Sequence, residues 1–190
     1  MHYKQIVKKL EPKLKKIIKF FTNKEFTNES NITWINTGFT SITFKIDNIF
    51  VKKIIQCREY DVYKREKYIS TILNDCKWYP SLLYFDDKDE ILVFQNVGNS
   101  IDVNNIPKDF KIQFNSILAD LKKLNIQHND IKAGEILIND NNSIYLCDFG
   151  WASINNNMNC GIGLWDCINL NKPGGYHDDN SFLRRVFSIN

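Results

Sequence analysis

The sequence predicts an α+β protein of two lobes joined by a short hinge. Alternating apolar and polar residues, typical of strands, dominate 33–56 and 81–94, with one helical segment between them. After Gly98 the pattern changes to helix and loops. The 190 residues, 43% of them hydrophobic, are enough for one core or for two small lobes that share a cleft. We expect three parts: a helical extension at 1–30, a first lobe at 31–97 and a reduced, mainly helical lobe at 98–190.

Composition bounds the class of protein. No apolar run approaches the roughly 20 residues that a bilayer crossing needs, and the N-terminus lacks a secretory signal. The five cysteines are an odd number without a Cys-x-x-Cys pair, which argues against a disulfide framework or a zinc site. We therefore expect an intracellular, cytoplasmic protein in a reducing compartment.

Residues 4–21 place apolar side chains at helical spacing, with lysines on the opposite face. The first 19 residues hold seven lysines and one acid, which leaves 18 basic against 21 acidic residues for the rest of the chain. A body of that charge is no general binder of nucleic acid. We expect the helix to pack on the body with a solvated lysine face. The alternative is contact with an anionic membrane surface or an acidic partner.

A β-hairpin is predicted at 42–55, with Asp47-Asn48 as its two-residue turn. In that register, alternate residues share one face and place a single lysine among apolar side chains. The residues of this face are Ile42, Phe44, Ile46, Ile49, Val51, Lys53 and Ile55.

The other expected elements follow the same patterns. They are a helix at 58–73, a second hairpin formed by 81–85 and 91–94, a helix that starts at Pro107, and short strands at 136–138 and 144–146.

Charged residues gather around the last two strands. Asp130 lies in the loop before the first of them and Asp148 follows the second, with Lys132 and Glu135 between. Phosphoryl transfer from ATP needs a carboxylate to orient the attacking hydroxyl, a cation for the γ-phosphate and oxygen ligands for magnesium. This cluster provides all three.

The same residues resemble the protein-kinase-like superfamily. His128-Asn-Asp130-Ile-Lys132-Ala-Gly-Glu135 is similar to its catalytic loop, and Asp148-Phe-Gly150 matches its metal-binding tripeptide. The resemblance implies that Asp130 orients the acceptor and that Lys132 neutralises the γ-phosphate. It further implies that Asp148 and Glu135 hold Mg²⁺, or Mn²⁺, and that His128 braces the loop.

Upstream residues extend the resemblance to 33–187. The strand Val51-Lys52-Lys53 is similar to the one whose lysine grips the ATP phosphates and pairs with a helix glutamate. The shared hairpin face favours Lys53 over Lys52, because Val51 on that face can line an adenine pocket. The choice of Lys52 would instead place Phe50 there. Its expected partner is Glu66, with Glu59 as the alternative.

Two loops complete the expected nucleotide site. The segment around Gly38 takes the place of the phosphate-binding loop and resembles that of choline and aminoglycoside kinases. The segment 94–98 fits the hinge, where backbone groups of Gln95 and Val97 would bind adenine. Asp178 is the expected start of the helix that ties back to the catalytic loop.

The resemblance implies an ATP- and magnesium-dependent phosphotransferase, and Lys132 favours a serine/threonine protein acceptor. Two departures support a pseudokinase as the alternative: Glu135 replaces asparagine, and Gly38 is the only glycine of its loop. A small-molecule kinase is a further alternative. The family's later helices are not recognised after 187, so we expect self-association to cover the surface that they would bury.

Overall fold

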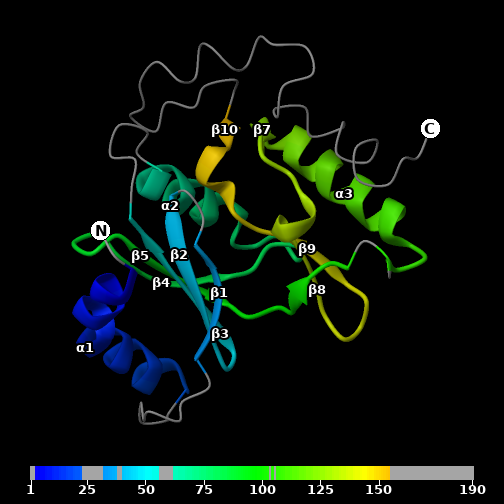
Figure 1. The fold of residues 1–190 in the computed structure, drawn as a ribbon. Coiled ribbons are helices and arrows are strands. Elements are labelled where there is room, and N and C mark those ends of the chain that lie inside the picture. Colours follow the sequence, from blue (N-terminus) through cyan, green and yellow to red (C-terminus); the bar gives the residue numbers. More distant parts are fainter. Residues whose placement is uncertain are drawn as a thin grey trace.

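The computed structural model describes residues 3–22, 32–37, 40–55, 62–102, 104 and 106–154. Its largest element is an antiparallel sheet of five strands in the order β1-β2-β3-β5-β4 (Figure 1). The strands are β1 (Ile32–Thr37), β2 (Ser41–Ile46), β3 (Ile49–Ile54), β4 (Leu82–Asp86) and β5 (Ile91–Gln95). Isoleucine, valine and phenylalanine are frequent in β3 and β5, as expected of strands with both faces covered.

Helix α1 (Tyr3–Thr22) covers one face of this sheet (Figure 1). Its buried side chains form a cluster with the sheet residues beneath it, so the helix packs on the body as the sequence predicts. The cluster consists of Leu10, Leu14, Ile17, Ile18, Ile42, Phe44, Ile46, Ile49, Val51, Ile91 and Val93. None of the helices in the described residues is both long and apolar enough to cross a bilayer.

A second core lies on the opposite face. It contains Phe50 and Ile54 of β3, runs through α2 (Val62–Leu73) and reaches Phe110 and Phe114 of α3 (Phe110–Lys123). Because one continuous apolar cluster joins the sheet to α3, the parts before and after Gly98 are packed against each other.

Short elements follow the five-stranded sheet. Strands β6 (Asn99–Ser100), β8 (Ile136–Ile138) and β9 (Ile144–Leu146) form one small sheet, and β7 (Ile126–Gln127) pairs with β10 (Ser153–Ile154). Two 3-10 turns, η2 (Ala133–Glu135) and η3 (Phe149–Trp151), carry residues of the two predicted motifs.

The predicted elements are found within the described residues, with shifts at their ends. The first hairpin has the predicted register, with Ile46 opposite Ile49 across the Asp47-Asn48 turn. Helix α3 begins at Phe110 rather than at Pro107, whose carbonyl accepts the Phe110 N–H in the preceding turn. Helix α2 is described from Val62, so its predicted start lies outside the described residues.

Candidate active site

A cavity of about 810 Å³ lies between the sheet face that carries Phe50 and Lys52 and the loops that carry the two predicted motifs. Its lining includes Asp130, Lys132, Glu135 and Asp148, which are four of the predicted site residues. Strands β8 and β9 bring both motifs to the same cavity because they pair directly, with Ile136 opposite Leu146.

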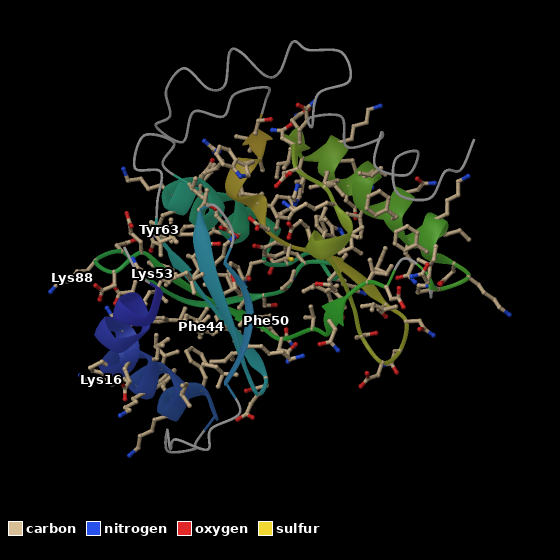
Figure 2. The ribbon with its side chains drawn as sticks, in the orientation of Figure 1. Lys16, Phe44, Phe50, Lys53, Tyr63 and Lys88 are labelled. Atoms are coloured by element: carbon tan, nitrogen blue, oxygen red, sulfur yellow. The ribbon has the colours of Figure 1, made fainter. Side chains whose placement is uncertain are left out.

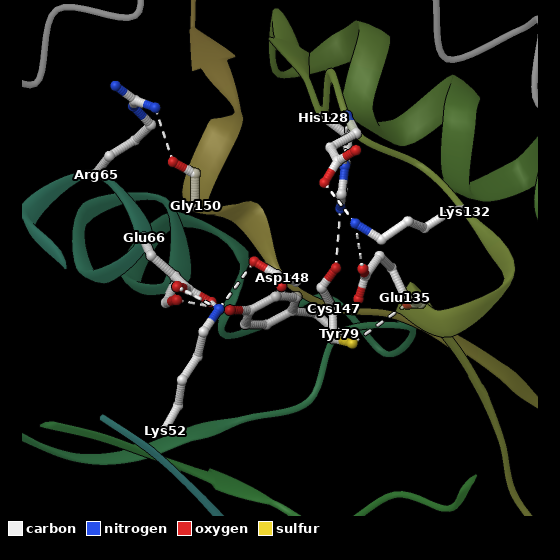
Figure 3. Close-up of polar contacts among 12 residues, drawn as sticks. Lys52, Arg65, Glu66, Tyr79, His128, Lys132, Glu135, Cys147, Asp148 and Gly150 are labelled. Carbon is white, nitrogen blue, oxygen red and sulfur yellow. Dashed lines mark hydrogen bonds and ion pairs between the residues drawn. The ribbon is translucent and has the colours of Figure 1, made fainter. Parts of the chain in front are cut away.

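Three elements meet at Lys52 of β3. Its Nζ lies 2.8 and 2.7 Å from the two carboxylate oxygens of Glu66 on α2, and 2.8 Å from Asp148 Oδ1 (Figure 3). Lys52 is 5% exposed and Glu66 is 1% exposed. Separating Lys52 from Glu66 would leave the buried Glu66 carboxylate without a cation, which is costly, so this pair holds the ammonium in place.

The expectation that Lys53 meets Glu66 is wrong. The Lys53 ammonium contacts the carbonyl of Asp89 and lies 3.9 Å from Glu90 Oε2. Its face of the sheet is the one that α1 covers (Figure 2). Phe50 and Lys52 lie on the opposite face and line the cavity.

The physical reason is that successive strand residues point to opposite faces. The predicted shared face exists, with Ile42 opposite Lys53 and Phe44 opposite Val51. The prediction places the nucleotide pocket on this apolar face, with Val51 in its wall. That apolar character instead serves the packing of α1.

Lys52 and Asp148 stabilise each other's charge, whereas burial and the nearby charge of Asp148 raise the pKa of Glu66 to about 7. Burial alone would lower the pKa of Lys52, but Asp148 and Glu66 raise it well above its ordinary value. Burial would raise the pKa of Asp148, but the Lys52 ammonium lowers it below its ordinary value. Lys52 is therefore a cation and Asp148 an anion at neutral pH.

A second ion cluster lies on the other wall of the cavity. Lys132 Nζ is 2.7 Å from Asp130 Oδ2 and 2.9 Å from Glu135 Oε1. Burial opposes the charge of Lys132, but the two carboxylates hold its pKa above the usual range. Burial and the nearby charge of Asp148 raise the pKa of Glu135 to about 7. Asp130, Lys132 and Glu135 thus form one connected group.

His128 contacts the backbone next to Asp148. The Asp130 N–H donates to His128 Nδ1 at 3.3 Å, so Nε2 carries the ring proton and donates to the Cys147 carbonyl at 2.9 Å. The imidazole is fully buried and contacts the Phe149 ring edge-on. These contacts agree with the bracing role predicted for His128.

The contacts of the structure do not test the remaining predicted residues. Gly38, Glu59 and Asp178 lie outside the described residues. Gln95 and Val97 follow Phe94, which lines the cavity. The Gln95 N–H already donates to the Ser81 carbonyl, and the Val97 side chain is part of the second core. Their contact with adenine stays a prediction.

Several cavity residues were not predicted. Phe50 lines the cavity where Val51 was expected, and Tyr79, which is hydrogen-bonded to Ser70 Oγ at 2.6 Å, lines it as well. Phe50 and Lys52 share one face of β3 because strand residues alternate, so placing Lys52 at the cavity would have predicted Phe50 there as well. Tyr79 lies in the loop before β4, where no local pattern points to the cavity.

The donor set fits a magnesium ion with phosphate ligands. Within the described ranges, no group of three or more His, Cys, Asp or Glu side chains is arranged to hold a metal ion. Mg²⁺, however, is commonly held by one or two carboxylates together with substrate phosphates and water. Asp148 and Glu135 are two such carboxylates, and both line the cavity.

No family model matches the sequence. The chain is 32% identical over 117 residues to a curated protein of Saccharomyces cerevisiae named Aurora kinase. The aligned part covers 55% of this chain and 31% of that protein. The similarity supports a protein-kinase-like relationship over part of the chain, and the α+β structure with its antiparallel sheet is compatible with a small kinase-like fold.

Proposed function

We propose that this protein is an ATP- and Mg²⁺-dependent phosphotransferase that transfers the γ-phosphate to a serine or threonine hydroxyl of a protein. The observation that carries the proposal is the convergence of Lys52, Glu66 and Asp148 on a cavity that also contains Asp130. These groups come from positions far apart in the chain, so their convergence is a property of the fold and not of one short motif. The partial similarity to a protein named Aurora kinase points to the same class of reaction.

Each charged residue has a role in the proposed reaction. The Lys52 ammonium would neutralise the α- and β-phosphates, and Glu66 holds it in place. Asp130 would orient the acceptor hydroxyl, and Lys132 would neutralise the γ-phosphate. Asp148 and Glu135 would hold Mg²⁺, which when bound neutralises charge on the transferred phosphate.

The proposal also covers features that the described contacts leave open. These are the two-lobed arrangement with its boundary near Val97, the contact of Gln95 and Val97 with adenine, and the phosphate loop around Gly38. Lys132 favours a protein hydroxyl as acceptor because the serine/threonine protein kinases, which the catalytic loop resembles, have a lysine there. Self-association of the chain remains a prediction, and so does the alternative of membrane-surface contact through the N-terminal helix.

The test is incorporation of phosphate from γ-labelled ATP into dephosphorylated casein in the presence of Mg²⁺. Asp130→Asn keeps the size of the side chain but removes the charge, and we expect it to lower incorporation at least 100-fold. The matched control is Asp140→Asn, the same change in the exposed turn between β8 and β9. Incorporation that is absent from the wild type, or equal in wild type and Asp130→Asn, would contradict the proposal.

One observation favours a pseudokinase as a second candidate. Lys132 already bonds Asp130 and Glu135, so the carboxylate that would orient an acceptor has a partner in this arrangement. A pseudokinase would bind nucleotide without transferring phosphate. It would therefore show no incorporation of label, while a separate thermal unfolding measurement would show a rise of the midpoint with ATP and Mg²⁺.

A further inference from the structure

Asp148 adopts a left-handed backbone conformation. Its φ of 64° and ψ of 65° lie in a region that residues other than glycine occupy uncommonly, aspartate and asparagine more often than most. Such a conformation persists where the surrounding structure fixes the neighbouring peptide groups. The Asp148 side chain reaches Lys52 from this backbone, so whatever fixes the turn also fixes the ion cluster.

One side of the turn is fixed by His128. The imidazole donates from Nε2 to the carbonyl of Cys147, the residue immediately before Asp148. His128 is fully buried, so this bond is protected from exchange with water. The peptide group before Asp148 is therefore held by a side chain from the loop after β7.

The other side of the turn is fixed by Arg65 of α2. Arg65 Nη1 donates to the carbonyl of Gly150 at 2.7 Å (Figure 3), and the whole Arg65 side chain has an exposed fraction of 0%. A buried guanidinium is costly unless acceptors meet it, so it stays where the carbonyl is. Arg65 and His128 thus hold carbonyls on the two sides of Asp148.

Gly150 allows α2 to come this close. A Cβ added at Gly150 would lie 2.9 Å from Val62 Cγ1 and 3.4 Å from Asp148 Oδ1. A larger residue would therefore separate α2 from the turn. Glu66 follows Arg65 directly on α2 and binds Lys52, so two consecutive helix residues act on the same site.

We propose that Arg65 is a positioning residue that, together with His128, holds the Asp148 turn in the conformation in which the Asp148 carboxylate meets Lys52. The inference deepens the proposed function. The positioning of Asp148 by Arg65 stands on the contacts alone, and only the reaction that the Asp148 carboxylate would serve rests on the proposed function. Arg65 itself does not contact the reacting atoms.

The experiment is hydrogen exchange of the protein without nucleotide, followed in peptides that cover 147–153 and, as an internal reference, 49–54 in β3. We expect Arg65→Met to exchange at least tenfold faster over 147–153 and at an unchanged rate in β3. Arg65→Lys retains a cationic donor and should restore part of the protection. Lys67→Met is the matched control: it removes a cation from the same helix, its contacts are with Asp87 and Phe85 rather than with the turn, and it should exchange like the wild type over 147–153.

Two results would overturn the inference: wild-type exchange over 147–153 in Arg65→Met, or faster exchange that is equal in β3 and in the turn. If Arg65→Met does not fold, Arg65→Gln carries the same expectation, because its shorter side chain cannot reach the Gly150 carbonyl. Exchange needs neither ATP nor turnover. A wild type that transfers no phosphate would refute the proposed function and leave this result standing.

Discussion

Lys52 and Asp148 are 96 positions apart in the chain, and the lysine Nζ lies 2.8 Å from Asp148 Oδ1. The contact joins β3 to the turn after β9, and Glu66 adds α2 as the third element. Such a contact exists only when the sheet, α2 and the β8–β9 pair are all folded and packed. The cluster therefore depends on the packing of the sheet, α2 and the β8–β9 pair.

Gly98 permits the close approach of the segment after β5 to β8. Its φ is +140°, and an added Cβ would lie 1.9 Å from the Ile138 carbonyl oxygen. We expect Gly98→Ala to lower the free energy of unfolding by about 2 kcal/mol or more, because backbone must move and the residue is strained. Gly134→Ala is the control, since nothing lies within 4 Å of its added Cβ. Urea unfolding measures both, and equal midpoints would contradict the described packing of Gly98.

Leu14 anchors α1 on the sheet. It is 2% exposed within the cluster that includes Phe44 and Val51. Leu14→Ala should lower the free energy of unfolding by about 3 kcal/mol, the usual cost of such a cavity. Lys16→Ala, an exposed change on the same helix, should alter it by less than about 0.5 kcal/mol. A Leu14→Ala variant as stable as wild type would mean that α1 does not pack on the sheet.

The docking of α1 should depend on pH through Asp86. A hydrogen bond from Lys13 lowers the pKa of Asp86 in the folded protein. The folded state then binds its proton less readily than the unfolded state, whose pKa is about 3.9. The pair therefore stabilises the fold at higher pH, and this contribution is lost as the pH falls below about 4.

Thermal unfolding at pH 5.5 and pH 3.5 tests this dependence on acid. The midpoint should fall by less in Lys13→Met than in the wild type, because the variant has no pair to lose. An equal fall in the two proteins would show that Lys13 and Asp86 do not contribute. Lys16→Met is the control for removal of a lysine from α1, and its midpoint should fall as in the wild type.

Local patterns were enough to predict most elements. The register of the first hairpin followed from a two-residue turn and alternation, and α3 followed from its apolar stripe. The same alternation did not reveal which face of the sheet meets the cavity, because that depends on where α1 packs. The choice between Lys52 and Lys53 was therefore a tertiary question, and the more apolar face gave the wrong answer.

The site could be predicted in part. The spacing of Asp130, Lys132 and Glu135 placed them in one loop, and they form one ion cluster. An ion pair between Glu66 and a lysine of β3 was predicted, but with Lys53 in place of Lys52. The hydrogen bond from Arg65 to the Gly150 carbonyl could not be predicted. The sequence of a helix does not show whether an arginine is buried or exposed, because that depends on which turn packs against the helix.

The binding of a non-hydrolysable ATP analogue with Mg²⁺, measured by calorimetry, decides whether the cavity with Lys52 is the nucleotide site. Lys52→Met should weaken binding at least tenfold, because it removes the cation between Glu66 and Asp148. Lys53→Met makes the same change one position on, toward the face under α1, and should bind like the wild type. Loss of binding in Lys53→Met with wild-type binding in Lys52→Met would contradict the assignment.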